Sequence, residues 1–138
     1  MILHAGLIAL REAGFWRGAL ITGPSGAGKS DLALRCLERG FRLIADDRVI
    51  LWRSGETVWG RAPEALSGLI EARGLGVLAE GVIAYSPVRL VVSHTEAPER
   101  MPEPETETLL NQRIAKLQLN FAEDSAPAKL RRALGALG

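Results

Sequence analysis

Eight residues near the start of the chain have the types and the spacing needed to hold a phosphate group. Residues 23–30 read Gly-Pro-Ser-Gly-Ala-Gly-Lys-Ser, which fits the pattern G-x-x-x-x-G-K-S. Glycines let successive backbone N–H groups turn inward on a phosphate at positions where a side chain would block its approach. Lys29 can supply positive charge to the outer phosphates of a nucleotide, and the Ser30 hydroxyl can bind Mg²⁺. The pattern predicts a phosphate-binding loop (P-loop, Walker A).

The segments on either side of this loop are suited to position it. Ala19–Thr22 is a short apolar run typical of a buried strand, and Ser30–Arg39 has the apolar spacing of a helix that Gly40 ends. The N-terminus of that helix would then point at the phosphate. A glycine-rich structural turn is the alternative, but the strand–loop–helix order favours a nucleotide site. The candidate nucleotide-binding residues are Gly23, Pro24, Ser25, Gly26, Ala27, Gly28, Lys29 and Ser30.

A pair of acidic residues, Asp46 and Asp47, follows the apolar segment Arg42–Ala45. In proteins with a phosphate loop, a strand near the loop commonly ends in an acid that faces the magnesium ion and the γ-phosphate. Adjacent residues of an extended segment point to opposite faces, so we expect only one of the two carboxylates to reach the reacting centre directly. That carboxylate could hold the metal or accept a proton from an attacking hydroxyl. The alternative is a solvated turn in which one aspartate pairs with Arg48.

The length and composition are those of one globular domain over residues 1–138. A hydrophobic fraction of 47% and a mean hydropathy of +0.09 exclude a disordered chain. No apolar run approaches the roughly 18 residues of a membrane span, and the start lacks the basic region of a secretory signal. The single Cys36 can form no disulfide within the chain. We therefore expect a cytoplasmic protein.

The charge distribution excludes nucleic acid and membrane surfaces as expected partners. The formal net charge is +1, so no global field would recruit nucleic acid or anionic lipid. The 14 arginine and 3 lysine residues are scattered along the chain and form no basic stripe.

The remaining pattern predicts an α/β fold. Two β-leaning runs, Ile2–Leu10 and Phe15–Thr22, are joined by a polar turn, which indicates a hairpin. A strand–helix–strand core favours an α/β domain, and the opening hairpin makes its sheet mixed. Further extended segments are expected at 42–45, 49–52, 57–59, 69–72, 88–93 and 114–119, an exposed loop at 96–107 and a short terminal helix at 128–137.

Four stretches together resemble a known family. Gly23–Val49, with the sequence GPSGAGKSDLALRCLERGFRLIADDRV, is similar to the catalytic domain of HPr kinase/phosphorylase, the bacterial serine kinase of the phosphotransfer protein HPr. His4–Gly6, Ala62–Glu64 and Leu69–Gly76 resemble further segments of that family, in the same order. The resemblance covers about residues 3 to 80 well and the last third poorly. It implies a P-loop kinase domain with a mixed central sheet, like that of HPr kinase and PEP carboxykinase.

The resemblance implies how the nucleotide and its metal ion are held. Lys29 and the loop would hold the phosphates of ATP, the phosphoryl donor. Ser30 and Glu71 would bind Mg²⁺, and Asp46 would assist as a second partner of the metal, directly or through water. Taken alone, Glu71 could also be an ordinary exposed strand residue.

The resemblance also implies the catalytic residues. Asp47 would be the acid/base that takes the proton from the HPr serine and returns one in the reverse, phosphorolytic direction, with Lys29 supplying charge. His4 and Arg100 match further active-site positions of the family. Taken alone, His4 could be a strand histidine with no catalytic part.

The sequence departs from the family in two respects. The family's usual form has an N-terminal domain before the kinase domain, whereas here its catalytic signatures begin almost at residue 1. The basic, glycine-containing segment that the family uses for phosphorolysis has no match, and Asn111–Ile114 occupies that region. We therefore expect a short, single-domain variant that lacks the N-terminal domain and carries out little phosphorolysis.

These observations predict an ATP- and Mg²⁺-dependent serine kinase that phosphorylates an HPr-like phosphocarrier protein of the bacterial phosphotransferase system. The resemblance further implies a homo-oligomer such as a hexamer. Two alternatives stay open: a P-loop kinase of small molecules, and a nucleotide-binding regulatory module without transfer activity. The chain is short for the lid domain that a small-molecule kinase would need, and the presence of both Asp47 and Glu71 disfavours a module without activity.

Overall fold

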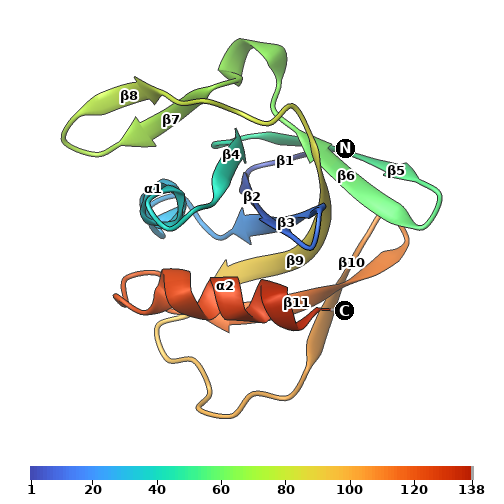
Figure 1. The fold of residues 1–138 in the computed structure, drawn as a ribbon. Helices are drawn as coiled ribbons and strands as arrows, with labels where there is room; N and C mark the ends of the chain where they lie inside the picture. Colours follow the sequence, from blue (N-terminus) through green and yellow to red (C-terminus); the bar gives the residue numbers. More distant parts are fainter. Residues whose placement is uncertain (138) are drawn as a thin grey trace.

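A curled, mixed β-sheet forms the centre of the fold, and two helices lie on one side of it (Figure 1). The structure is a computed structural model, and it describes residues 1–137. In chain order its elements are β1 Ile2–Leu3, β2 Gly6–Glu12, β3 Phe15–Thr22, α1 Lys29–Leu37, β4 Arg42–Ala45, β5 Val49–Ser54, β6 Thr57–Arg61, the 3-10 helix η1 Glu64–Leu66, β7 Leu69–Ala72, β8 Gly76–Ala79, β9 Ser86–His94, β10 Glu105–Leu109, β11 Gln112–Leu119 and α2 Ala126–Ala136.

Strand β9 connects the parts of the sheet. The strand order is β1-β5-β6-β9-β3-β2-β4, and β11 also pairs with β9 and carries β10 on its other side. The first residues of β9, Ser86 and Pro87, pair with β6 in antiparallel fashion, and the rest of β9 runs parallel to β3 and to β11. Gly18 of β3 lies opposite this change of partner, where a Cβ atom would overlap the carbonyl oxygen of Pro87. Glycine at this position lets the two strands approach closely.

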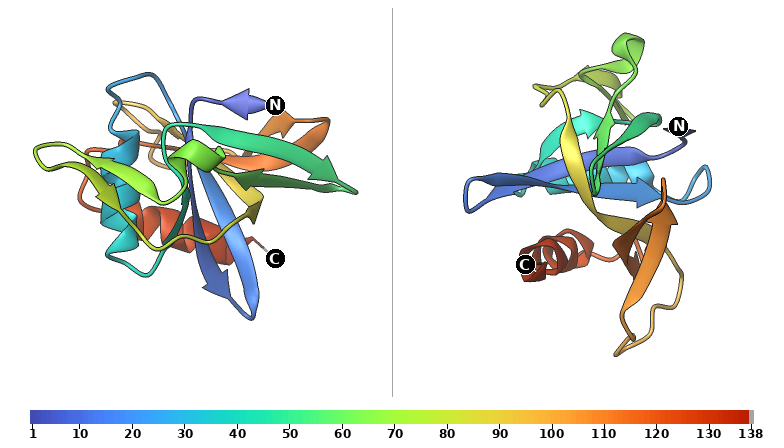
Figure 2. Two further views of the ribbon diagram at one scale, coloured as in Figure 1. Left: turned by 90° about the horizontal axis from the view of Figure 1, so that it is seen from above. Right: turned by 90° about the vertical axis from the view of Figure 1, so that its right-hand side faces the viewer.

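Two tight hairpins flank the centre of the sheet. Strands β2 and β3 are joined by Ala13 and Gly14, which both have positive φ values, as a two-residue turn that matches the twist of the strands requires. Strands β10 and β11 are joined in the same way by Leu110 and Asn111. Figure 2 shows that the β10–β11 hairpin and the separate β7–β8 hairpin project from opposite sides of the molecule.

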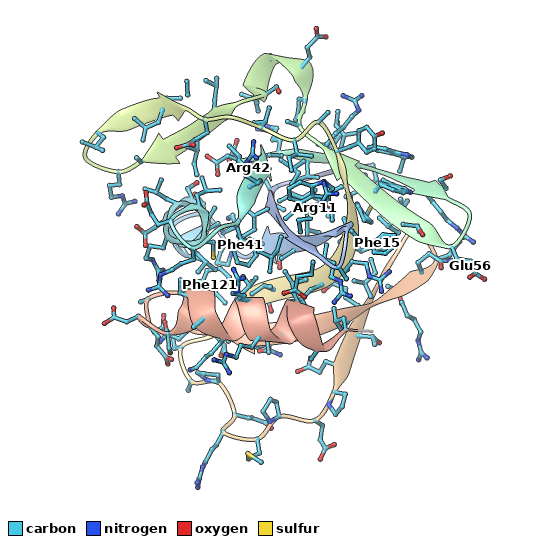
Figure 3. All side chains as sticks on the ribbon, in the orientation of Figure 1. Arg11, Phe15, Phe41, Arg42, Glu56 and Phe121 are labelled. Atoms are coloured by element: carbon cyan, nitrogen blue, oxygen red, sulfur yellow. The ribbon has the colours of Figure 1, made fainter. Side chains whose placement is uncertain are left out.

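Apolar side chains form a core on each face of the sheet. On the helical face, alternate residues of β2, β3, β9 and β11 pack against α1 and α2. Phe41 and Phe121 are fully buried members of this core and lie between the sheet and the helices (Figure 3). On the opposite face, the curl of the sheet brings β5 and β6 against β2, β3 and β9. The position of both cores explains why β2, β3 and β9 each contain an uninterrupted run of buried residues.

The expected α/β fold with a mixed sheet is confirmed, including the opening hairpin and the helix after the glycine-rich loop. The run Ile2–Leu10 is not one strand, however, because Ile2–Leu3 forms β1, which pairs with β5, and the hairpin strand β2 begins at Gly6. The expected loop at 96–107 is wrong at its end, because residues from Glu105 onward form strand β10. The alternating Glu and Thr side chains of β10 stay at the surface while its backbone pairs with β11, so a charged run is compatible with this edge strand. The terminal helix begins at Ala126 rather than at residue 128. Within residues 1–137, no helix is long and apolar enough to cross a membrane.

Candidate active site

Several chain segments meet at one edge of the sheet. Strands β3, β9 and β11 are parallel, and β4 runs in the same direction because both β3 and β4 are antiparallel to β2. Their carboxyl ends therefore lie together, beside the start of β2. In open α/β sheets, ligands bind in the crevice outside the carboxyl ends of the strands. The glycine-rich loop, the Asp46–Asp47 pair, His4 and the chain after β11 all follow or precede these strand ends.

The glycine-rich loop, residues 23–30, connects β3 to α1. Gly23, Gly26 and Gly28 have φ values of 149°, 85° and 95°, which residues with a Cβ atom rarely adopt. Lys29 folds back over the loop, and its Nζ donates hydrogen bonds to the carbonyl oxygens of Gly23 and Pro24, at 2.7 and 3.0 Å. Gly28 provides no side-chain cap for helix α1, so the N–H groups of its first turn have no side-chain acceptor there.

Asp46 is buried at the centre of the site, and the residue is 8% exposed. One carboxylate oxygen, Oδ1, accepts a hydrogen bond from the Ser30 hydroxyl at 2.7 Å. The other, Oδ2, accepts the backbone N–H of Glu71 at 2.9 Å. Asp46 thereby joins the end of β4 to helix α1 and to strand β7, which explains how a buried carboxylate is stabilised here.

Asp47 is far more exposed than Asp46, with its side chain 58% exposed. Its φ of 70° is unusual for a residue with a side chain, and the Arg48 N–H bonds to the Asp46 carbonyl at 2.8 Å across this turn. His4 Nδ1 lies 3.8 Å from Oδ1 of Asp47, and Arg48 Nε lies 3.8 Å from Oδ2. The two acids thus lie in a tight turn rather than in an extended segment, and they differ in burial although both line one cavity.

A cavity of about 360 Å³ brings most of the predicted site residues together. It is lined by Ser25, Gly26, Gly28, Lys29, Ser30, Asp31, Leu34, Asp46, Asp47, Glu71, Ala72 and Arg73. His4 is not among the lining residues, but its Nδ1 lies 3.8 Å from the carboxylate of Asp47, which is. Arg100 does not line it: this residue lies in the segment between β9 and β10 and lines a separate cavity beside helix α2.

Helix α1 holds the loop against the sheet with its apolar side, where Leu32, Ala33 and Cys36 are buried. Burial raises the pKa of the Cys36 thiol to about 12, although the charges of Arg35 and Arg39 act in the opposite direction. The thiol is therefore a core group and takes no part in the chemistry of the site.

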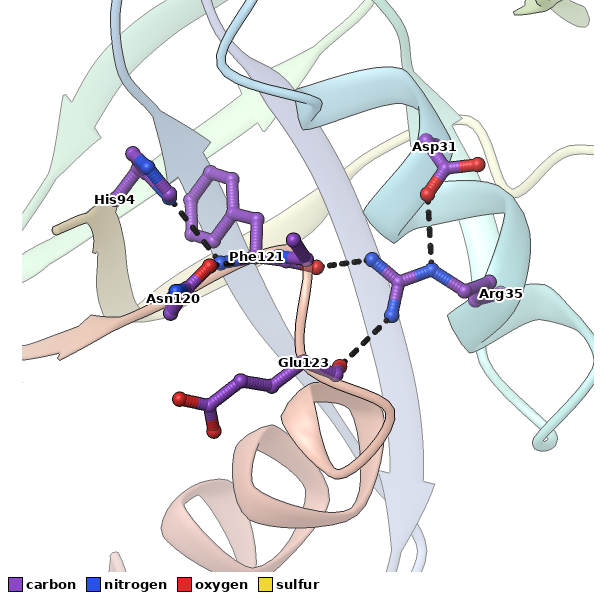
Figure 4. Close-up of polar contacts among 7 residues, drawn as sticks. Asp31, Arg35, His94, Asn120, Phe121 and Glu123 are labelled. Carbon is purple, nitrogen blue, oxygen red and sulfur yellow. Dashed lines mark hydrogen bonds and ion pairs between the residues drawn. The ribbon is translucent and has the colours of Figure 1, made fainter. Parts of the chain in front are cut away.

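Three residues beside the glycine-rich loop could not be identified from the sequence. His94 ends β9, Phe121 follows β11, and Arg35 lies on α1, and hydrogen bonds connect Phe121 to both of the others (Figure 4). No local pattern marks these residues. Arg35 follows the loop on α1, whereas His94 and Phe121 are brought beside the loop by the parallel pairing of β3, β9 and β11, which joins distant parts of the sequence.

The fold and the site together are those of an α/β domain with a glycine-rich loop at the carboxyl edge of its sheet. Comparison with known proteins identifies the family. The family model described as the HPr Serine kinase C-terminal domain matches residues 2–124. The chain therefore belongs to the HPr serine kinase C-terminal domain family.

Relatives with curated descriptions share only part of their length with this chain. The HPr kinase/phosphorylase of Lacticaseibacillus casei strain BL23 is 56% identical over 62 residues, which are 44% of this chain and 19% of the relative. The HPr kinase/phosphorylase of Enterococcus faecalis is 47% identical over 83 residues, 54% of this chain and 27% of the relative. The matched part thus spans about a fifth to a quarter of the length of these relatives.

A solved structure matches almost the whole chain. The Hpr(Ser) kinase/phosphatase from Coxiella burnetii superimposes with a TM-score of 0.79 and 26% sequence identity, over 96% of this chain and 92% of that chain. The last third of the chain, where the sequence resemblance is poor, is therefore part of a shared fold.

Proposed function

We propose that this chain is a cytoplasmic, ATP- and Mg²⁺-dependent serine kinase that phosphorylates an HPr-like phosphocarrier protein. The observation that carries the proposal is the contact between Ser30 and Asp46 beside a glycine-rich loop, in a cavity that also contains Lys29 and Asp47. One cavity thus offers a phosphate-binding backbone, a positive charge and two carboxylates, which is the set of groups that phosphoryl transfer needs.

The loop would hold the phosphates of ATP. The positive φ values of Gly23, Gly26 and Gly28 support this role, because they allow backbone N–H groups to face a common centre. The ammonium group of Lys29 is held by two carbonyl oxygens of the loop. It would exchange them for the outer phosphate oxygens, where it stabilises the charge that develops during transfer.

The donor atoms around Ser30 fit Mg²⁺, which takes oxygen ligands, keeps several waters and shares phosphate oxygens with its substrate. Ser30, Asp46 and Glu71, which carry one hydroxyl and two carboxyl groups, line the cavity. Residues 1–137 contain no group of three or more His, Cys, Asp or Glu side chains that could hold a metal by themselves. Ser30 and Glu71 would therefore bind the ion together with the phosphates, and Asp46 would orient Ser30. When bound, Mg²⁺ neutralises charge on the transferred phosphate.

Asp47 would act as the general base. Asp47 lines the cavity and its side chain is 58% exposed, so an incoming serine could reach its carboxylate. It would accept the serine proton while the serine oxygen bonds to the γ-phosphorus. The bond from that phosphorus to the oxygen bridging to the β-phosphate breaks, and ADP leaves with the electron pair. His4 and Arg48, which lie 3.8 Å from the Asp47 carboxylate, would hold it in position.

A folded protein suits this site better than a small molecule as the acceptor. The cavity opens beside the β7–β8 hairpin, where Leu75 and Val77 expose their apolar side chains. A docked protein could cover these side chains and exclude water from the γ-phosphate. The segment that the resemblance implies for phosphorolysis has no match in this sequence, where Asn111–Ile114 occupies that region, so we propose that the forward reaction predominates.

The test is incubation of the purified chain with Mg²⁺, radiolabelled ATP and HPr-like proteins, followed by mass spectrometry to locate the phosphate. We expect one phosphoserine on the HPr-like protein and little removal of that phosphate when inorganic phosphate is added. Rapid labelling of a small molecule with none on any HPr-like protein would contradict the acceptor class. ATP binding without any transfer would favour the regulatory module. Efficient phosphate-dependent reversal would contradict only the proposed direction.

A further inference from the structure

The ring of Phe121 supports the glycine-rich loop. Phe121 is fully buried and lies two residues after the end of β11. A Cβ atom at Gly23 would lie 4.0 Å from Cε2 of Phe121 and 3.8 Å from Cβ of His94, and a Cβ atom at Gly28 would lie 4.0 Å from Cβ of Phe121. The Gly23 end of the loop therefore lies close to the Phe121 ring and the Gly28 end lies close to the Phe121 Cβ atom, so the position of Phe121 limits how closely the loop can approach the sheet.

The backbone of Phe121 is held from two directions, as Figure 4 shows. Its N–H donates a hydrogen bond to Nδ1 of His94 at 3.1 Å, and its carbonyl oxygen accepts one from the guanidinium of Arg35. Arg35 also donates to the Glu123 carbonyl and, through Nε at 3.0 Å, to the carboxylate of Asp31, which lines the active-site cavity. Phe121 is thus tied both to the end of β9 and to the helix that begins with Lys29.

The contact of Phe121 determines which nitrogen of His94 carries the proton. A backbone N–H can only donate, so Nδ1 must accept and the ring proton lies on Nε2. That nitrogen lies 3.1 Å from the Glu96 carboxylate, to which it donates. The imidazole is 15% exposed and packs against the Phe121 ring with the centroids 5.1 Å apart and the planes at 62°. His94 is therefore oriented on both sides with a defined tautomer.

We propose that His94 is a positioning residue for phosphate binding: through Nδ1 it holds Phe121, and through the Phe121 ring it holds the glycine-rich loop in its binding conformation. This inference rests on the proposed function for its effect on ATP, but the connection to the loop can be tested without any ligand. Because the imidazole of His94 would touch no reacting atom, His94 would affect phosphate binding through Phe121.

Two substitutions separate the acceptor atom from the rest of the side chain. His94→Asn places an amide oxygen near the position of Nδ1 and keeps an acceptor for the Phe121 N–H, whereas His94→Leu fills a similar volume without one. Glu96→Gln, at a carboxylate that is 90% exposed, is the matched control for the other ring nitrogen. Val58→Ala removes a buried methyl pair in the core on the other face of the sheet, and it controls for loss of stability alone.

The first measurement is amide hydrogen exchange of the proteins without ligand. We expect His94→Leu to speed amide exchange at residues 26–30 and at Phe121 more than in strands β5 and β6. In His94→Asn, the exchange rates at these residues should be close to those of the wild-type protein. In Val58→Ala, exchange should instead become faster in strands β5 and β6 than at residues 26–30 and Phe121. Uniform loss of protection across the sheet in His94→Leu would overturn the proposal, because it would show that His94 supports only the general fold.

The second measurement is calorimetric titration with ATP and Mg²⁺. We expect affinity about tenfold weaker in His94→Leu, the scale of leaving one buried N–H without an acceptor, and near the wild-type value in His94→Asn and Glu96→Gln. Equal loss in His94→Asn and His94→Leu would overturn the role of Nδ1. Absence of binding in the wild-type protein would instead contradict the proposed function, and the exchange experiment would still decide whether His94 holds the loop.

Discussion

The hydroxyl oxygen of Ser30 lies 2.7 Å from Oδ1 of Asp46, and the serine hydroxyl donates a hydrogen bond to this buried carboxylate. The hydrogen of Ser30 is therefore directed at Asp46, and the lone pairs of its oxygen are directed toward the cavity. The hydroxyl is thus oriented to act as a ligand for a cation, and Asp46 is the residue that fixes this orientation.

Asp46→Asn should weaken the magnesium dependence of ATP binding more than it lowers the stability of the folded protein. The amide can still accept the Glu71 N–H, but toward Ser30 it presents an N–H₂ group, which takes up a lone pair of the hydroxyl. We expect the Mg²⁺ concentration for half-maximal ATP binding to rise about tenfold, the scale of an altered partner of a metal ligand. Titration of Mg²⁺ at fixed ATP measures this, and an unchanged midpoint would contradict the role given to Asp46.

Lys29→Met should abolish productive ATP binding and leave thermal stability nearly unchanged. The Nζ group contacts only two carbonyls of its own loop, so its removal leaves no buried charge unpaired. Calorimetric titration with ATP and Mg²⁺, together with a thermal melt, is the measurement. The matched control is Lys129→Met in helix α2, which breaks a surface ion pair with Glu123, does not line the active-site cavity and should bind ATP normally. Unchanged affinity and turnover in Lys29→Met would exclude the phosphate-binding role of the loop.

Asp47→Asn should retain ATP binding and lose phosphoryl transfer by at least about 10²-fold, the usual contribution of a general base. An amide cannot accept the serine proton, while the exposed position of the residue means that the fold tolerates the change. Single-turnover transfer to an HPr-like protein measures the loss, and Asp124→Asn, at another exposed acid, is the control. Near-full transfer in Asp47→Asn with loss in Asp46→Asn would mean that the two roles are reversed.

Much of the site could be predicted because its parts are local in sequence. The residues from Ala19 to Asp47 form a strand, a loop, a helix and a strand in immediate succession, so glycine spacing and apolar periodicity were enough to place them. The left-handed turn at Asp47 could not be predicted, because only its closure against β2 through the Ala5 N–H imposes it. Glu71 was expected to contribute its side chain, and the structure shows that its backbone N–H also holds Asp46.

The remainder of the fold depends on pairing between distant segments. Strand β10 reads as an acidic loop, because its pairing with β11 is a backbone interaction that its side chains do not reveal. The neighbourhood of His94 and Phe121 depends on two parallel pairings around β9. Parallel pairs leave little local pattern, since their partners are joined by long connections.

Stability should fall with rising pH above the ordinary pKa of a thiol because of Cys36. The pKa of this thiol is about 12 in the folded protein, against a normal value of 9.0. Its contribution to the free energy of unfolding is therefore complete below pH 9, and it is lost as the pH rises toward 12, because the unfolded chain releases the proton while the folded protein retains it. The slope should approach about 1.4 kcal/mol per pH unit for this one group. Urea unfolding of wild type and Cys36→Ala between pH 8 and roughly 11 isolates it, and parallel curves for the two proteins would contradict the prediction.

Gly18→Ala should destabilise the protein by about 1–3 kcal/mol, the usual cost of overpacking. The added Cβ would overlap the Pro87 carbonyl oxygen, which the pairing of β3 with β9 holds in place. Gly135→Ala is the contrasting change, because in helix α2 the new methyl meets only the flexible end of Glu12, and alanine favours a helix. Urea unfolding of both variants is the measurement, and equal stabilities would show that β3 and β9 can separate.

The central place of β9 in the sheet also determines the order in which the protein can fold during synthesis. A nascent chain that ends before Ser86 contains β2, β3 and β4 as one unit and β5 and β6 as another, but it lacks the strand that joins them. Apolar residues of both units stay exposed until β9 leaves the ribosome, and β11 must follow before Phe121 can reach the loop. While the first two thirds of the chain are being synthesised, the exposed apolar residues of nascent molecules can therefore aggregate or bind chaperones.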